Sequence, residues 1–202
     1  MAGFFVILNS KMKIAVFIDG SNFYSKLKEL KIKHTSRFNY NGCILSLTKG
    51  TKPVYVGYYV GQVRKEKNNP KSELLYSHQQ KLFAHLQSNI PNIKIVRGHI
   101  QNYNGIYKEK GVDVRLALDL YSLAIKKKYD KAILISSDSD LIPAVRMVQA
   151  LNKEVEYIGF SHNTSMALIK ECKSKRLLNF DDIYSFSHNI TKTNSQGKIK
   201  VV

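Results

Sequence analysis

Short apolar runs rich in β-branched residues alternate along this chain with longer stretches of helical periodicity. That alternation is typical of βαβ units, in which parallel strands form a sheet and helices cover both of its faces. Strands are predicted near residues 13–18, 53–60, 93–96, 132–136 and 155–158, and helices near residues 23–30, 72–88, 112–127, 142–151 and 164–171. We therefore predict an α/β fold, a three-layer sandwich around a central, mainly parallel sheet.

The order of the strands follows from the handedness of their connections. Right-handed crossovers place the second and third strands on one side of the first, with the fourth and fifth on the other. The predicted order is 3-2-1-4-5. Residues 98–110 contain Asn102-Tyr-Asn-Gly105 and are predicted to form a hairpin or a long loop, because Asn-Gly supplies the positive φ that a tight turn needs.

The length of 202 residues and the 44% hydrophobic content are sufficient for one domain with a buried core. We assign residues 13–187 to this domain, residues 1–12 to an N-terminal extension without a function, and residues 188–202 to a flexible polar tail. The apolar run within the first ten residues lacks the features of a signal peptide and is too short to span a bilayer. No membrane association is therefore expected.

The net charge of +17, from 32 Lys and Arg against 15 Asp and Glu, predicts a positive field that attracts polyanions. Nucleic acid is the leading partner class, although such a charge also serves solubility alone. The two cysteines, Cys43 and Cys172, have no zinc-ligand spacing and give no support for a disulfide. Their use fits a reducing, cytoplasmic location.

Carboxylates follow two of the predicted strands at the point where each strand ends. Asp19 follows the apolar run 14–18, and Asp138 and Asp140 follow the run 132–135. Because ligands bind beyond the carboxyl ends of parallel strands, where the winding reverses, we expect these residues to meet there, with Asp113 at the start of an intervening helix. Carboxylates at the edge of a core are costly unless they are paired, and hard oxygen donors without His or Cys suit Mg²⁺ or Mn²⁺.

These residues also have structural explanations. Asn22 is a favoured residue type for capping the helix after the first strand, and Asp138 or Ser139 could cap the helix after the fourth. Asp113 could be a first-turn residue that the helix dipole favours. The combination of several carboxylates at neighbouring strand ends favours the metal site over separate caps.

Other features carry less weight. Asp119 can pair with Arg115 at four-residue spacing, so a surface salt bridge is its default explanation. Four basic residues after the second strand are suitably placed for phosphate contacts: Arg64, Lys65, Lys67 and Lys71. Four tyrosines could stack on unpaired bases, although packing is the commoner role: Tyr58, Tyr59, Tyr103 and Tyr107.

At these residues the chain resembles NYN domain proteins of the LabA-like branch, within the PIN-like nuclease group. The resemblance rests on three blocks, in order: Phe17-Ile-Asp-Gly-Ser-Asn22, Lys110-Gly-Val-Asp-Val114 with Asp119 downstream, and Ile135-Ser-Ser-Asp-Ser-Asp-Leu-Ile-Pro143. It spans roughly residues 13–187. Three blocks in order are far more specific than any one of them.

The resemblance implies a PIN-like sandwich with a Mg²⁺- or Mn²⁺-dependent ribonuclease site. The implied acidic set, serving both catalysis and metal binding, is Asp19, Asp113, Asp138 and Asp140. Asn22 would orient a ligand or substrate, Lys110 would sit beside the scissile phosphate, and Asp119 could contribute. Ser137 stands where the family often has Gly, and Leu141 where Phe is common. Ser137 thus adds a side chain close to the expected metal.

The main hypothesis is therefore a metal-dependent endoribonuclease. A second is an RNA-binding or adaptor module whose acidic site is inactive. A third is a phosphatase or nucleotide hydrolase with Asp19 as nucleophile, but the usual second Asp two residues later is replaced by Ser21. Whether single-stranded DNA is also accepted, and whether the chain forms a homodimer, stays open.

Overall fold

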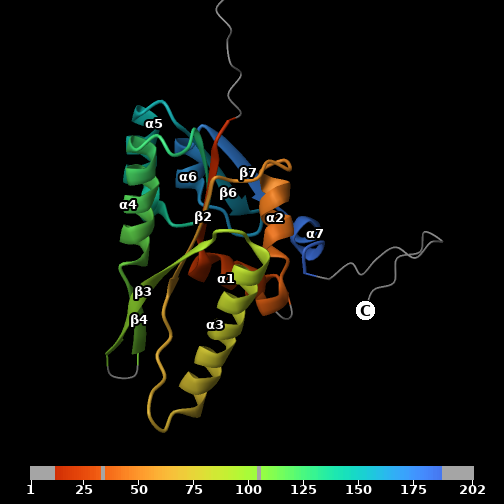
Figure 1. The fold of residues 1–202 in the computed structure, drawn as a ribbon, viewed down its shortest axis with the longest axis vertical. Helices are drawn as coiled ribbons and strands as arrows, with labels where there is room; N and C mark the ends of the chain where they lie inside the picture. The colour runs from red at the N-terminus through yellow and green to blue at the C-terminus, as the bar shows by residue number, and fades with distance from the viewer. Residues whose placement is uncertain (1–11, 33–34, 104–105, 188–202) are drawn as a thin grey trace, which may run out of the picture.

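The computed structural model describes residues 12–32, 35–103 and 106–187, and of residues 99–103 and 106–109 the backbone alone (Figure 1). Apart from Met12, the predicted extension and tail lie outside this part of the chain. No helix of the described residues is long and apolar enough to cross a membrane.

Strands and helices alternate along the described chain. The strands are β1 (Ile14–Asp19), β2 (Tyr55–Gly61), β3 (Lys94–Tyr103), β4 (Ile106–Lys110), β5 (Lys131–Ile135), β6 (Glu154–Phe160) and β7 (Ser174–Leu178). The α-helices are α1 (Gly20–Glu29), α2 (Tyr40–Leu47), α3 (Pro70–Asn89), α4 (Val112–Ile125), α5 (Ile142–Ala150), α6 (Met166–Glu171) and α7 (Phe180–Tyr184). Two short 3₁₀ helices are η1 (Thr35–Arg37) and η2 (Ser139–Leu141).

The strands form one sheet in the order β4-β3-β2-β1-β5-β6-β7. All neighbours are parallel except β3 and β4, which form an antiparallel hairpin. The five strands predicted from the sequence are β1, β2, β3, β5 and β6, so the predicted order 3-2-1-4-5 is confirmed. The structure adds β4 and β7 at the two edges.

Two apolar cores lie on opposite faces of the sheet. Along β1, Val16 and Ile18 face the core that α1, α2 and α3 cover, whereas Ala15 and Phe17 face the core under α4 and α5. Figure 1 shows α4 along one side of the sheet and α2 with α3 along the other. The central strands are therefore buried on both faces, as the three-layer prediction requires.

Several elements were not predicted. Helix α2 contains Asn41 and Gly42, which are poor helix formers, and Asn39 begins it by accepting a hydrogen bond from the Gly42 N–H at 2.8 Å. Strand β7 alternates half-buried and exposed residues and carries Lys175 and Arg176, so its sequence is polar, as suits an edge strand. Helix α7 was not predicted either, and it lies after the last predicted helix, near residues 164–171.

The hairpin expected over residues 98–110 is confirmed. Strands β3 and β4 pair from His99 opposite Lys110 to Tyr103 opposite Ile106, and the turn at 104–105 lies outside the described residues. After β4 the chain passes through Gly111, whose φ of 79° is a left-handed conformation that glycine adopts without strain. The hairpin therefore delivers the chain to the start of α4 at Val112.

Candidate active site

Asp19 ends β1 and is almost buried, with 5% of its surface exposed. Its Oδ1 accepts the Asn22 N–H at 3.0 Å, and its Oδ2 accepts the Ser136 hydroxyl at 2.8 Å. Asp19 is thus the N-cap of α1, so the interpretation of Asn22 as that cap is wrong. A Cβ at Gly20 would collide with the Tyr58 ring, which explains the glycine directly after the aspartate.

Ser136 connects Asp19 to the second group of carboxylates. Ile18 of β1 lies opposite Ile135 of β5, so the residues that follow these two positions meet at the same edge of the sheet. The Ser136 hydroxyl donates to Asp19 and accepts the Asp138 N–H at 3.1 Å. Sequence reasoning passed over Ser136, although its place between a strand and an acidic motif is a usable signal.

Asp138 and Asp140 lie at the start of η2, just before α5. Asp138 is the N-cap of η2, and its Oδ1 accepts the Asp140 N–H at 2.9 Å. The capping explanation therefore describes one oxygen of Asp138. Capping does not explain why this carboxylate and that of Asp140 lie at the strand end that faces Asp19.

Asp113 lies in the first turn of α4. Partial burial raises the pKa of its carboxyl, and the negative charges of Asp138 and Asp140 raise it further. These two residues come from a different part of the chain, so the fold brings three carboxylates into electrostatic contact. Asp19 joins the same edge through Ser136.

The donor chemistry of this edge fits a hard divalent cation. Carboxylate oxygens predominate, and Ser137 adds a hydroxyl oxygen that is buried without a hydrogen-bond partner among the described residues. The described His, Cys, Asp and Glu side chains form no group of three close enough to hold an ion by themselves. Mg²⁺ commonly uses only one or two carboxylates together with waters and substrate phosphates, so the arrangement fits an open site rather than a protein cage.

Two further predicted residues, Lys110 and Asp119, lie on either side of Asp113 in the sequence. Lys110 ends β4, is exposed, and lies three residues before Asp113. Asp119 is held by Arg115 at 3.2 Å and by the Tyr59 hydroxyl at 3.2 Å, which confirms the predicted salt bridge. Six residues turn an α-helix by about 600°, so Asp113 and Asp119 point to different faces of α4.

The predicted basic residues follow β2, whose carboxyl end lies beside that of β1. They are exposed: Arg64, Lys65, Lys67 and Lys71. Lys65 pairs with Glu73 at 2.9 Å and lies over the Tyr76 ring. Among the described residues, Arg64, Lys67 and Lys71 form no ion pair, so their charge is available to an anion.

The tyrosines of β2 cannot stack on bases, so that expectation is wrong for Tyr58 and Tyr59. Both are fully buried. The Tyr58 hydroxyl donates to the Gly20 carbonyl at 3.4 Å, and burial raises the pKa of Tyr59 far above its ordinary value. The side chains of Tyr103 and Tyr107 lie outside the described residues.

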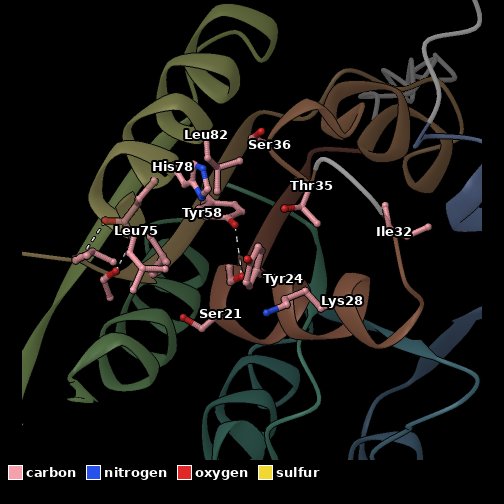
Figure 2. Close-up of a pocket in the computed structure, with 15 residues that line it drawn as sticks. Ser21, Tyr24, Lys28, Ile32, Thr35, Ser36, Tyr58, Leu75, His78 and Leu82 are labelled. Atoms are coloured by element: carbon pink, nitrogen blue, oxygen red, sulfur yellow. Dashed lines mark hydrogen bonds between the residues drawn. The ribbon is translucent and has the colours of Figure 1, made fainter. Parts of the chain in front are cut away.

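Sequence reasoning also missed a pocket that begins at the residue after Asp19. It has a volume of about 570 Å³ and lies between α1, η1, the end of β2 and α3 (Figure 2). Tyr24 and Lys28, four residues apart on α1, could have indicated it, because such spacing puts both side chains on one helix face.

The NYN domain family model matches residues 13–178. The chain belongs to the NYN domain family. This is a family of PIN-like nucleases, whose members generally use divalent metals and typically act on RNA.

A comparison with curated proteins gives no match. Among solved structures, the fold is similar to the crystal structure of VPA0982, a protein of unknown function from Vibrio parahaemolyticus RIMD 2210633. The two share 26% sequence identity with a TM-score of 0.63, over 91% of this chain and 99% of that one. The fold of this NYN domain is therefore PIN-like.

Proposed function

We propose that this NYN domain is a metal-dependent endoribonuclease of the LabA-like branch that hydrolyses RNA phosphodiester bonds at the edge formed by β1, β5 and α4. The observation that carries the proposal is that carboxylates from three segments of the chain lie at one edge of the sheet: Asp19, Asp113, and the pair Asp138 and Asp140. The net charge of +17 supports a polyanionic substrate. A cytoplasmic location and a homodimer stay predictions.

The carboxylates would hold one or more Mg²⁺ or Mn²⁺ ions, with Ser137 as a further oxygen donor. When bound, such an ion supplies an activated water and stabilises negative charge on the phosphate. Hydrogen bonds from the Asn22 N–H and the Ser136 hydroxyl hold Asp19 in position, and Ser136 also links it to Asp138. A site held by short hydrogen bonds loses little free energy to rearrangement when the substrate binds.

Residues around the carboxylates would position the RNA. Lys110 would contact the scissile phosphate, and Asn22 would orient the substrate or a bound water from the first turn of α1. Arg64, Lys67 and Lys71 would contact phosphates further along the strand. Asp119 is left out of this site because Arg115 and Tyr59 already engage its carboxylate.

The test is cleavage of a labelled single-stranded RNA with Mn²⁺, with Mg²⁺ and with a chelator. The wild type and Asp138→Asn are compared, since Asn keeps the capping function at this position while removing the charge. Metal-dependent cleavage that is lost in the variant is expected. Equal cleavage by both proteins would contradict the assignment. A parallel assay on single-stranded DNA defines whether the 2′-hydroxyl is required.

A second candidate is an RNA-binding or adaptor module without catalysis. It is favoured by the lack of a ready-made group of three metal-binding side chains among the described residues. Salt-dependent RNA binding with no cleavage under any divalent ion would select it. The phosphatase or nucleotide hydrolase ranks last, because Ser21 stands where a second Asp is usual.

A further inference from the structure

The pocket next to Asp19 opens on the other face of the sheet from α4. Its floor includes Tyr58 and Val60, which belong to the core covered by α1, α2 and α3. Gly20 and Ser21 form its edge and follow Asp19 directly in the chain. Its volume of about 570 Å³ lies within the range of sites that bind small molecules, so it is large enough for one nucleotide.

Two walls of the pocket expose apolar surface. Tyr24 on α1 is 41% exposed and Leu75 on α3 is 47% exposed, although both line the pocket. Figure 2 shows the α1 residues Tyr24 and Lys28 across the pocket from the α3 residues Leu75 and His78. An aromatic face opposite an aliphatic side chain suits a flat, unpaired base, because every base has a π-face that can stack.

The pocket is held open by hydrogen bonds that do not involve a ligand. Gln79 of α3 accepts the Val63 N–H at 2.9 Å and donates to the Gly61 carbonyl at 2.7 Å, which ties the end of β2 to α3. The Tyr58 hydroxyl donates to the Gly20 carbonyl and ties the floor to α1. A preformed pocket binds without the cost of ordering its walls.

The charge around the pocket favours a nucleic acid strand. Lys28 lines it, with Nζ 5.6 Å from the centroid of the Tyr24 ring, and none of its described lining residues is Asp or Glu. Arg64 follows the lining residue Val63, so the exposed basic segment from Arg64 to Lys71 starts at the rim. A strand could therefore run from the carboxylates, past Gly20, to these cations.

We propose that the pocket binds an unpaired base of the RNA strand, beside the phosphate that lies at Asp19, by stacking it on Tyr24. This inference deepens the proposed function, and it rests on that function for the assumption that the bound strand is RNA. Tyr24 is then a determinant of substrate affinity, and the enzyme prefers RNA that is single-stranded next to the cut.

The experiment measures binding of a fluorescent single-stranded RNA of roughly ten nucleotides, by anisotropy, at fixed salt and in chelator so that nothing is cut. Two ligands are compared with it: an oligonucleotide of the same length with abasic residues throughout, and a nucleoside monophosphate as competitor. The proteins are the wild type, Tyr24→Ala, Tyr24→Phe and the control Tyr184→Ala. Tyr184 is exposed to a similar extent but does not line the pocket.

Tyr24→Ala should weaken binding of the intact RNA by about fivefold or more, while Tyr24→Phe and Tyr184→Ala keep wild-type affinity. The abasic ligand should bind the wild type and Tyr24→Ala equally, since no base remains to stack. Equal binding of intact RNA by wild type and Tyr24→Ala overturns the inference, as does an equal loss on both ligands. Displacement of the RNA by an equimolar nucleoside monophosphate would identify a site for free nucleotides and also overturns it.

These outcomes are independent of cleavage. A wild type that binds through Tyr24 but never cuts RNA would contradict the proposed nuclease and leave the base pocket standing. Metal-dependent cutting without an effect of Tyr24→Ala on affinity would support the proposed nuclease and contradict the base pocket. Circular dichroism of each variant tests whether it is folded. Because the Tyr24 side chain is partly exposed, its replacement should leave the fold intact.

Discussion

The Ser136 hydroxyl donates a hydrogen bond of 2.8 Å to Asp19 across the carboxyl ends of two neighbouring parallel strands. Both residues are almost fully buried, with 1% and 5% of their surfaces exposed. Hydrogen bonds to charged groups contribute more than neutral ones, and a buried acceptor that loses its donor is costly. Ser136 is therefore a positioning residue for Asp19.

Ser136→Ala should lower the free energy of unfolding by about 1.5–3 kcal/mol and should reduce kcat more than it raises KM. Urea denaturation and cleavage kinetics measure the two effects. Ser174→Ala is the matched control, because the Ser174 hydroxyl donates to Glu154 at 2.7 Å away from the carboxylate edge. An equal loss of activity in both variants would show that stability alone limits cleavage.

Divalent metal should stabilise the protein, because a cation relieves the repulsion that Asp138 and Asp140 exert on Asp113. We expect Mn²⁺ to raise the Tm of the wild type, with a much smaller rise for Asp138→Asn. Mn²⁺ should raise the Tm of Asp130→Asn by as much as that of the wild type, since Asp130 lies beside Lys13 and Lys153, away from this edge. An unchanged Tm in the wild type at millimolar Mn²⁺ would argue against a metal site.

Asp119 should prove structural. Its carboxylate accepts hydrogen bonds from Arg115 and from the buried Tyr59, so Asp119→Asn should lower stability modestly while cleavage of RNA persists. Thermal denaturation and a cleavage assay at a temperature well below the Tm separate the two effects. Loss of cleavage in a folded Asp119→Asn would place this residue among the catalytic carboxylates.

The central fold could be predicted because its determinants are local. Strands such as β1 and β5 are apolar runs, and the handedness of their connections leaves few orders for them. The apolar character of these runs also explains why the interpretation of β2 was wrong. A central strand is buried on both faces, so alternation of side chains does not indicate an exposed residue. Tyr58 and Tyr59 are both buried.

The positions of the four carboxylates near the ends of strands and helices could be predicted from the sequence, whereas the residues that support them could not. That Ser136 bonds to Asp19 depends on the register of β1 against β5, which apolar runs do not specify to one residue. The pocket depends on how α1, η1 and α3 are arranged around the end of β2, and these elements come together only in the folded chain. Tyr24 and Leu75 line it from positions about fifty residues apart.

Acid should weaken the anchoring of β1 at its start. The Lys13 N–H and the Lys153 ammonium both donate to Asp130 at 3.0 Å, and they lower the pKa of this carboxyl, the Lys13 N–H most of all. A lowered folded-state pKa means that the unfolded chain binds the proton more tightly. The contribution of Asp130 to stability is therefore present above its ordinary pKa of about 3.9 and disappears as the pH falls through the lowered value.

Asp130→Asn should accordingly be less stable than the wild type at neutral pH, by less than about 1 kcal/mol because the carboxyl is largely exposed, and equally stable near pH 2. Urea denaturation at several pH values measures the difference. Lys153→Met should keep the larger part of the pH dependence, since it leaves the bond from the Lys13 N–H intact. A wild type and Asp130→Asn that differ by the same amount at every pH would contradict this account, because the difference would then come from packing rather than from the charge.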